Sequence, residues 1–174
     1  MFKLTFKRPL AAVVSLCLLI GLVGIVSAKV KLTDDSVEVK ITENLFEDAR
    51  LARKKGVPIV VMFSQDGCAY CNIVRESFLK PLLVNKEYDS KVLVREFKVD
   101  SFEDVRNFDG KMIPADELAH QVRAFLTPTV IVFDSTGKLH HRIVGLVNEH
   151  YYSGELDVAI NNTLEHIHQV AANN

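Results

Sequence analysis

The sequence predicts an α/β fold in which helices cover both faces of a mixed central sheet. Three observations predict it. An apolar, β-branched run occupies residues 57–63, apolar residues recur at helical spacing after it, and two strand-like segments near the end flank a short turn. The expected order of elements is β-α-β-α-β-α-β-β-α, which requires a mixed sheet.

The first expected elements precede this apolar run. Weak alternation over 36–41 predicts a short strand, and Thr42 is placed to cap a following helix. This helix is expected to end at Gly56, because three cations occupy its last turn and glycine accepts a left-handed cap. Residues 57–63 are then expected to form a central strand that is covered on both faces.

A second helix is expected to begin at the cysteine pair. From Cys71 the apolar residues Val74, Phe78 and Leu82 follow at spacings of three, four and four. Pro81 is expected to kink this helix or to end it near Lys80.

The rest of the chain continues the alternation of strands and helices. Phe97 and Phe102 are assigned to the core, and the last helix shows an apolar stripe of period near 3.6. The expected elements are a strand at 91–99, a loop-like insertion at 101–113, a helix at 115–125, a hairpin of strands 129–133 and 139–147, and a C-terminal helix.

Length and composition exclude several classes of protein. The chain has 174 residues, of which 48% are hydrophobic and 25% charged, close to the averages for soluble globular proteins. These values exclude a disordered tail, a collagen-like fibre and a small disulfide-stapled scaffold. Lys plus Arg is 21 against 22 for Asp plus Glu, so no basic excess indicates a nucleic-acid partner.

Residues 1–28 are expected to be a signal peptide. Residues 1–9 carry cations and no acid, residues 10–26 are almost wholly apolar, and Val26-Ser27-Ala28 resembles a cleavage site. An uncleaved N-terminal anchor is the alternative, because the apolar run approaches the ~20 residues that span a bilayer. Either outcome places residues 29–174, which form one expected domain, in the periplasm or otherwise outside the cytoplasm. Contact with a membrane is expected only if the segment is retained.

Residues 29–174 contain two cysteines, Cys68 and Cys71, which can bond only each other or another protein. Their spacing places the two thiols one turn apart at the start of a helix, close enough for a disulfide. The positive end of the helix favours the Cys68 thiolate, which is the nucleophile in disulfide exchange. Cys68 is therefore predicted to attack and Cys71 to resolve, while Asp66 is expected to cap the helix.

A Cys-x-x-Cys pair is also found in zinc sites and in structural disulfides, and both readings remain alternatives. A zinc site needs two further ligands, and the histidines supply no obvious second half, since His140 and His141 point to opposite faces of a strand. No metal is therefore assigned. A copper(I) carrier using Cys68, Cys71 and His141 is the alternative function, because soft thiolates select copper(I).

Together these features resemble the thioredoxin superfamily over nearly all of residues 29–174. The resemblance rests on the strand that leads into Cys68-Ala69-Tyr70-Cys71 and on Thr127-Pro128-Thr129 at the start of the penultimate strand. The resemblance implies a thioredoxin fold in which a cis-proline, here Pro128, packs against the cysteine pair. It further implies that Thr127 and Pro128 line the substrate groove and that Ala69 and Tyr70 tune the pair.

The resemblance implies an exported thiol–disulfide oxidoreductase without a bound cofactor. Its partners would be proteins with disulfides and a membrane thiol protein that donates electrons. No basic residue lies between the cysteines, unlike in the most oxidising exported members, so a reductase or isomerase is expected. Three departures from thioredoxins are Gly67, where they usually have Trp, Ala69-Tyr70, where they have Gly-Pro, and Met62, where they bury an acid that assists proton transfer.

Overall fold

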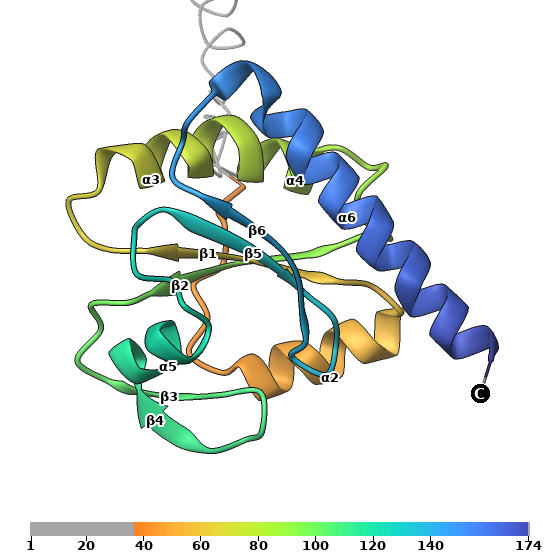
Figure 1. The fold of residues 1–174 in the computed structure, drawn as a ribbon, viewed down its shortest axis with the longest axis horizontal. Helices are drawn as coiled ribbons and strands as arrows, with labels where there is room; N and C mark the ends of the chain where they lie inside the picture. Colours follow the sequence, from red (N-terminus) through yellow and green to blue (C-terminus); the bar gives the residue numbers. More distant parts are fainter. Residues whose placement is uncertain (1–36, 174) are drawn as a thin grey trace, which may run out of the picture. The chain divides into compact units, whose positions relative to one another are not determined.

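A computed structural model describes residues 37–173 (Figure 1). At its centre lies a four-stranded sheet in the order β2-β1-β5-β6, in which β1 and β2 are parallel and the other neighbours antiparallel. The strands are β1 (Ile59–Ser64), β2 (Leu93–Lys98), β5 (Thr129–Phe133) and β6 (Leu139–Val144). The predicted mixed sheet is confirmed. The expected signal peptide or anchor at 1–28 lies outside the described residues.

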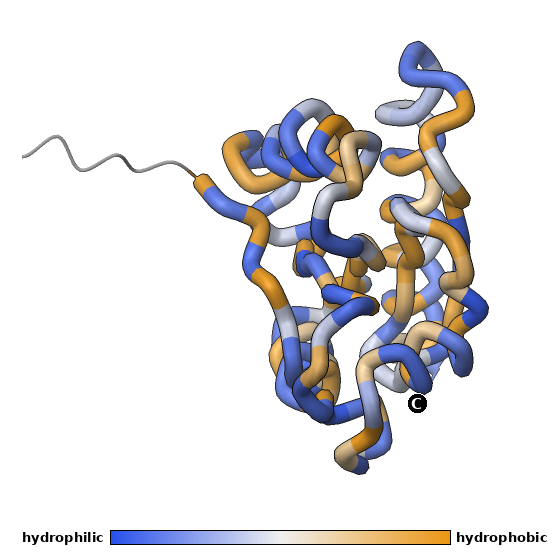
Figure 2. The backbone as a smooth tube through the Cα atoms, turned by 90° about the vertical axis from the view of Figure 1, so that its left-hand side faces the viewer, coloured by the Kyte–Doolittle hydropathy of each residue, from blue (hydrophilic) through white to orange (hydrophobic). Residues whose placement is uncertain are grey.

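Helices cover both faces of this sheet, as Figure 1 shows. Alternate residues of β1 enter different cores: Phe63 packs with α2 and α5, whereas Met62 packs with α3, the π-helix η1 and α6. Apolar stretches, orange in Figure 2, run through the interior of the domain. The helices are α2 (Leu45–Lys55), α3 (Ala69–Val74), η1 (Arg75–Leu79), α4 (Lys80–Val84), α5 (Ala115–Gln121) and α6 (Glu149–Ala172).

The helix after the cysteines is irregular where Pro81 enters it. Residues 75–79 form a π-helix, after which α4 continues to Val84. Proline has no N–H group and its ring crowds the preceding turn, so the backbone widens locally. The expected disturbance is confirmed, but the helix does not end near Lys80.

The segment before α2 differs from its prediction. Residues 37–40 form no strand, and Ile41 makes only an isolated bridge to Glu96 on the edge strand β2. Asn44, not Thr42, caps α2: its Oδ1 accepts a hydrogen bond of 3.1 Å from the Glu47 N–H. The end of the helix is as expected, with Gly56 at a φ of 68°.

The insertion after β2 also differs, because it contains a small antiparallel hairpin of β3 (Asp104–Arg106) and β4 (Met112–Pro114). Phe97 is buried, as expected, at 1% exposure, whereas Phe102 is 104% exposed and its assignment to the core was wrong. The helix expected at 115–125 ends at Gln121, since Arg123 takes a φ of 55°, which no helix continues.

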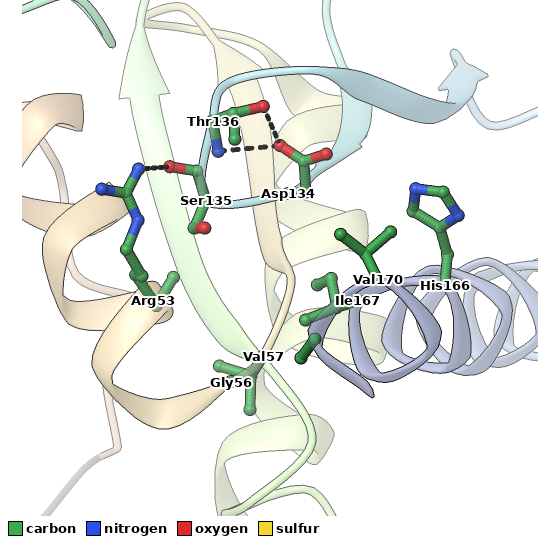
Figure 3. A pocket seen from close by; sticks show the side chains of 11 residues that line it. Arg53, Gly56, Val57, Asp134, Ser135, Thr136, His166, Ile167 and Val170 are labelled. Carbon is green, nitrogen blue, oxygen red and sulfur yellow. Dashed lines mark hydrogen bonds between the residues drawn. The ribbon is translucent and has the colours of Figure 1, made fainter. Parts of the chain in front are cut away.

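Asp134 organises the turn of the predicted hairpin between β5 and β6 (Figure 3). Its Oδ1 accepts hydrogen bonds from the Thr136 N–H at 2.8 Å and hydroxyl at 2.6 Å, and its Oδ2 lies 2.8 Å from His140 Nε2. Burial alone raises the pKa of Asp134, but the hydrogen bonds from His140 and Thr136 outweigh it and lower that pKa below 3.8.

We expect Asp134→Ala to lower the free energy of unfolding at pH 7 by about 1–3 kcal/mol, because several donors lose their acceptor. A carboxylate with a lowered pKa stabilises the fold above its unfolded pKa and loses this effect as pH falls through the folded pKa. The difference from wild type should therefore shrink below about pH 3.8. Urea unfolding at pH 7 and pH 3 checks this, with Ser135→Ala as control. An equal difference at both pH values would contradict it.

Candidate active site

The two cysteines form a disulfide at the point where β1 passes into α3. Their Cα atoms are 5.2 Å apart, and the Cys71 N–H donates a 3.1 Å hydrogen bond to Cys68 Sγ, which caps the helix. Cys68 is partly exposed, whereas Cys71 is fully buried. The predicted pairing is confirmed, and Cys68 is the more exposed residue of the pair.

Asp66 does not cap this helix, contrary to the expectation. Its carboxylate lies 2.9 Å from Lys98 Nζ, and its N–H donates to Asp100 Oδ2 at 2.9 Å. Cys68 occupies the cap position because the turn after β1 delivers it, and not Asp66, to the first free N–H groups of α3. Asp66 instead ties the turn before the cysteines to the segment that follows β2.

The structure brings the Thr127-Pro128 motif to the same end of the central strands as the cysteine pair. Phe63 near the end of β1 pairs with Thr129 at the start of β5, so Thr127 and Pro128 lie where the chain turns toward the cysteines. The Thr127–Pro128 peptide bond is cis, as expected. Pro128 is buried, and its carbonyl accepts a 2.7 Å hydrogen bond from the Gly145 N–H.

Large apolar side chains are exposed at this edge. Tyr70, between the cysteines, is 61% exposed, and Ala69 is exposed beside it. Phe125 and Leu126, directly before Thr127, are 64% and 66% exposed. The sequence prediction missed both, although their position next to the Thr-Pro motif was a usable signal.

A buried charge cluster, which the sequence prediction also missed, lies behind the cysteine helix. Glu96 is 2% exposed, and its carboxylate accepts hydrogen bonds from Arg75 Nε and Nη2, each at 2.6 Å, and from Ser64 Oγ at 2.5 Å. Burial alone raises the pKa of Glu96, but the hydrogen bonds from Arg75 and Ser64 outweigh it and lower that pKa.

The histidine proposed for copper(I) contacts an acid: His141 Nε2 lies 3.3 Å from Glu155 Oε1. Within residues 37–173, no group of three or more His, Cys, Asp or Glu side chains is arranged to hold a metal ion. Over the same residues, no helix is long and apolar enough to cross a bilayer.

A separate cavity of about 390 Å³ lies at the opposite edge of the sheet, between the end of α2, the β5–β6 turn and α6 (Figure 3). Arg53, Asp134 and His166 are among its lining residues. Arg53 already donates a 3.0 Å hydrogen bond to the Ser135 carbonyl, and Asp134 is held by its turn. This cavity plays no part in the cysteine site.

Comparison with known proteins gives one family. The model for the thioredoxin-like domain matches residues 45–160. No curated protein matches the sequence.

The chain is also similar to several solved structures. Thioredoxin from Fasciola hepatica is 20% identical, with a TM-score of 0.50 over 71% of this chain and 98% of that chain. A thioredoxin-like protein from Clostridium perfringens is 22% identical, with a TM-score of 0.49 over 76% and 90%. Mitochondrial thioredoxin 3 from Saccharomyces cerevisiae is 19% identical, with a TM-score of 0.47 over 68% and 94%. At 20% identity, the likeness to the Fasciola hepatica thioredoxin concerns the fold alone.

Proposed function

Because this chain belongs to the family of thioredoxin-like domains, we propose that it is an exported thiol–disulfide oxidoreductase that reduces or isomerises protein disulfides. The observation that carries the proposal is the disulfide itself. Cys68 is partly exposed at the start of α3, and Cys71 is buried behind it. An accessible sulfur backed by a buried partner suits attack followed by internal resolution.

The reaction begins with the reduced pair. The Cys68 thiolate attacks one sulfur of a substrate disulfide, forms a mixed disulfide, and releases the other substrate sulfur as a thiolate that takes a proton from water. Cys71 then loses its proton to water and attacks Cys68 Sγ, which releases the second substrate thiol. Two electrons pass to the substrate, and the Cys68–Cys71 disulfide seen in the structure is the product.

The local geometry favours the first of these steps. The Cys71 N–H that points at Cys68 Sγ at 3.1 Å stabilises a thiolate there, as does the positive end of the helix. The thiolate fraction determines how fast a cysteine attacks a disulfide. Cys71 is fully buried and its sulfur is bonded to Cys68 Sγ in the structure, so it is placed to attack that sulfur and release the substrate thiol.

We assign the substrate groove to Thr127, Pro128, Ala69 and Tyr70. The register of Phe63 with Thr129 brings the segment with Thr127 and Pro128 to the end of β1 from which the cysteine motif leaves, and Tyr70 is exposed there.

Repeated turnover needs a reductant for the disulfide. We assign this role to a membrane thiol protein, on the expectation that residues 1–28 direct the chain out of the cytoplasm. Recovery of a chain that begins near Lys29 from the periplasmic fraction would support this location. Retention of the full chain in the membrane fraction would support the anchored form.

The reduction potential tests the direction of the reaction. With no basic residue between the cysteines, we expect equilibration with glutathione buffers to give about −180 to −270 mV, the range of isomerases and thioredoxins. The reduced protein should also restore activity to a substrate with scrambled disulfides. A potential near about −120 mV would contradict the reductase and isomerase reading.

A further inference from the structure

Two neighbouring residues of β2, Arg95 and Glu96, are both charged and both buried. They point to opposite faces of the sheet. Arg95 pairs with Asp48 of α2 at 2.7 Å, and Glu96 pairs with Arg75 at 2.6 Å on the side of the cysteine helix. The Arg95–Asp48 pair lies on the face of the sheet away from the cysteine helix. The Arg75–Glu96 pair has no role in the exchange steps proposed above.

Arg75 connects this second pair to the cysteines. Its backbone N–H bonds to the Cys71 carbonyl, so it lies one turn further along the same helix, and its Nη1 donates to Asn72 Oδ1 at 2.7 Å. A hollow of about 350 Å³ is lined by Gly67 and Asn72, which flank the cysteine motif, and by Arg75 and Glu96. The charge pair therefore borders the loop that holds the disulfide.

The charged side chains that line this hollow are two cations, Arg75 and Lys98, and four carboxylates, Asp66, Glu96, Glu38 and Glu76. Glu38 and Glu76 are exposed and pair with Lys80. Glu96 faces Arg75 at 2.6 Å and Lys98 at 3.7 Å, and Lys98 also faces Asp66 at 2.9 Å. Glu96 is the carboxylate in direct contact with the Arg75 guanidinium. Loss of its charge would leave that guanidinium without its buried partner and make the surroundings of the cysteine helix less negative, which stabilises a thiolate.

Glu96 is poorly suited to carry the proton of Cys71. Both carboxylate oxygens already accept hydrogen bonds, Oε1 from Ser64 and Arg75 and Oε2 from Arg75. The lowered pKa keeps this group ionised at neutral pH, which makes it a weak base. Its effect on the cysteines is therefore electrostatic and acts through Arg75.

We propose that Glu96 is a positioning residue that keeps the Cys68–Cys71 pair reducing by neutralising the Arg75 guanidinium. The proposal rests on the proposed function and extends it, since it names the residues that set the direction of exchange. Stabilising the Cys68 thiolate favours the reduced form and makes the disulfide a stronger oxidant. By neutralising the guanidinium, Glu96 prevents Arg75 from stabilising the Cys68 thiolate.

A charge cycle tests this. Reduction potentials are measured in glutathione buffers for the wild type, Glu96→Gln, Arg75→Gln and the double variant. Glu96→Gln should move the equilibrium constant three- to tenfold toward the dithiol and lower the pKa of the Cys68 thiol. Arg75→Gln should move it the opposite way, and the double variant should return to within twofold of wild type. Tenfold corresponds to about 30 mV for this two-electron couple.

A merely structural role gives a different pattern. If the pair only held the helix in place, both single variants would shift the potential in the same direction and the double variant would not recover. That result, or no shift in Glu96→Gln, would overturn the proposal. If Arg75→Gln does not fold, the pKa of the Cys68 thiol in Glu96→Gln is the deciding measurement. A lowered pKa supports the proposal, and an unchanged or raised pKa overturns it.

Asp48→Asn is the matched control, because it removes the buried carboxylate that pairs with Arg95 on the opposite face of the same strand. It should lower stability and leave the potential within twofold of wild type. A shift as large as that of Glu96→Gln would contradict a local effect. The potential is read with glutathione, so it stays measurable even if exchange with protein substrates fails, which would count against the proposed function alone.

Discussion

Cys68→Ser is expected to abolish disulfide exchange, with a loss of rate of more than about 10³-fold. The serine hydroxyl stays protonated at neutral pH and cannot form a disulfide with the substrate. Cys71 cannot substitute for it, because its side chain has no exposed surface. The rate of reduction of a protein disulfide, followed by the appearance of substrate thiols, measures this loss.

Cys71→Ser is the control for this experiment. Cys68 remains able to attack, but no thiol is left to resolve the mixed disulfide, so substrate proteins should accumulate in covalent complexes with Cys68. These complexes should appear on non-reducing gels and vanish with a thiol reductant. If both variants trap nothing and behave identically, Cys68 is not the attacking residue.

Phe63→Ala is expected to lower the free energy of unfolding by about 3–5 kcal/mol. Phe63 lies in β1 and has no exposed surface, and its ring centroid lies 5.3 Å from that of Phe97. Truncation removes this contact and leaves a cavity that the rigid sheet cannot close. Urea unfolding of the reduced and oxidised protein measures the loss.

Phe102→Ala is the matched control, since it makes the same chemical change at a side chain that is 104% exposed. It should leave the free energy of unfolding within about 0.5 kcal/mol of wild type. A loss as large as that at Phe63 would show that Phe102 is buried in solution. Phe102 would then belong to the core to which its sequence pattern had assigned it.

Much of the framework followed from local sequence signals. The apolar run at 57–63 predicted a buried central strand, and β1 is buried along its whole length. Gly56 ends α2 in the left-handed conformation that its position indicated, and a helix begins directly after Cys68. These predictions held because each depends on residues within about one turn or strand of the signal.

Other features depend on partners that are distant along the chain. The sequence marked Met62 as the place where an acid was missing, yet the structure places Glu96 beside it, as its register partner on β2. The burial of Glu96 is tolerated because Arg75, from a different element, supplies the opposite charge. The sequence around Glu96 and the sequence around Arg75 contain no local pattern that predicts this ion pair.

The sequence by itself determined the order of most elements, the cysteine pair at a helix start, and the Thr127-Pro128 motif that opens a strand. The tertiary structure alone decided which of these meet: the register of Phe63 with Thr129 brings both motifs to one edge of the sheet. It also decided that Phe102 is exposed and that Glu96 is buried. The physical reason is that periodicity and capping act over a few residues, whereas burial and charge pairing depend on which strands and helices pack together.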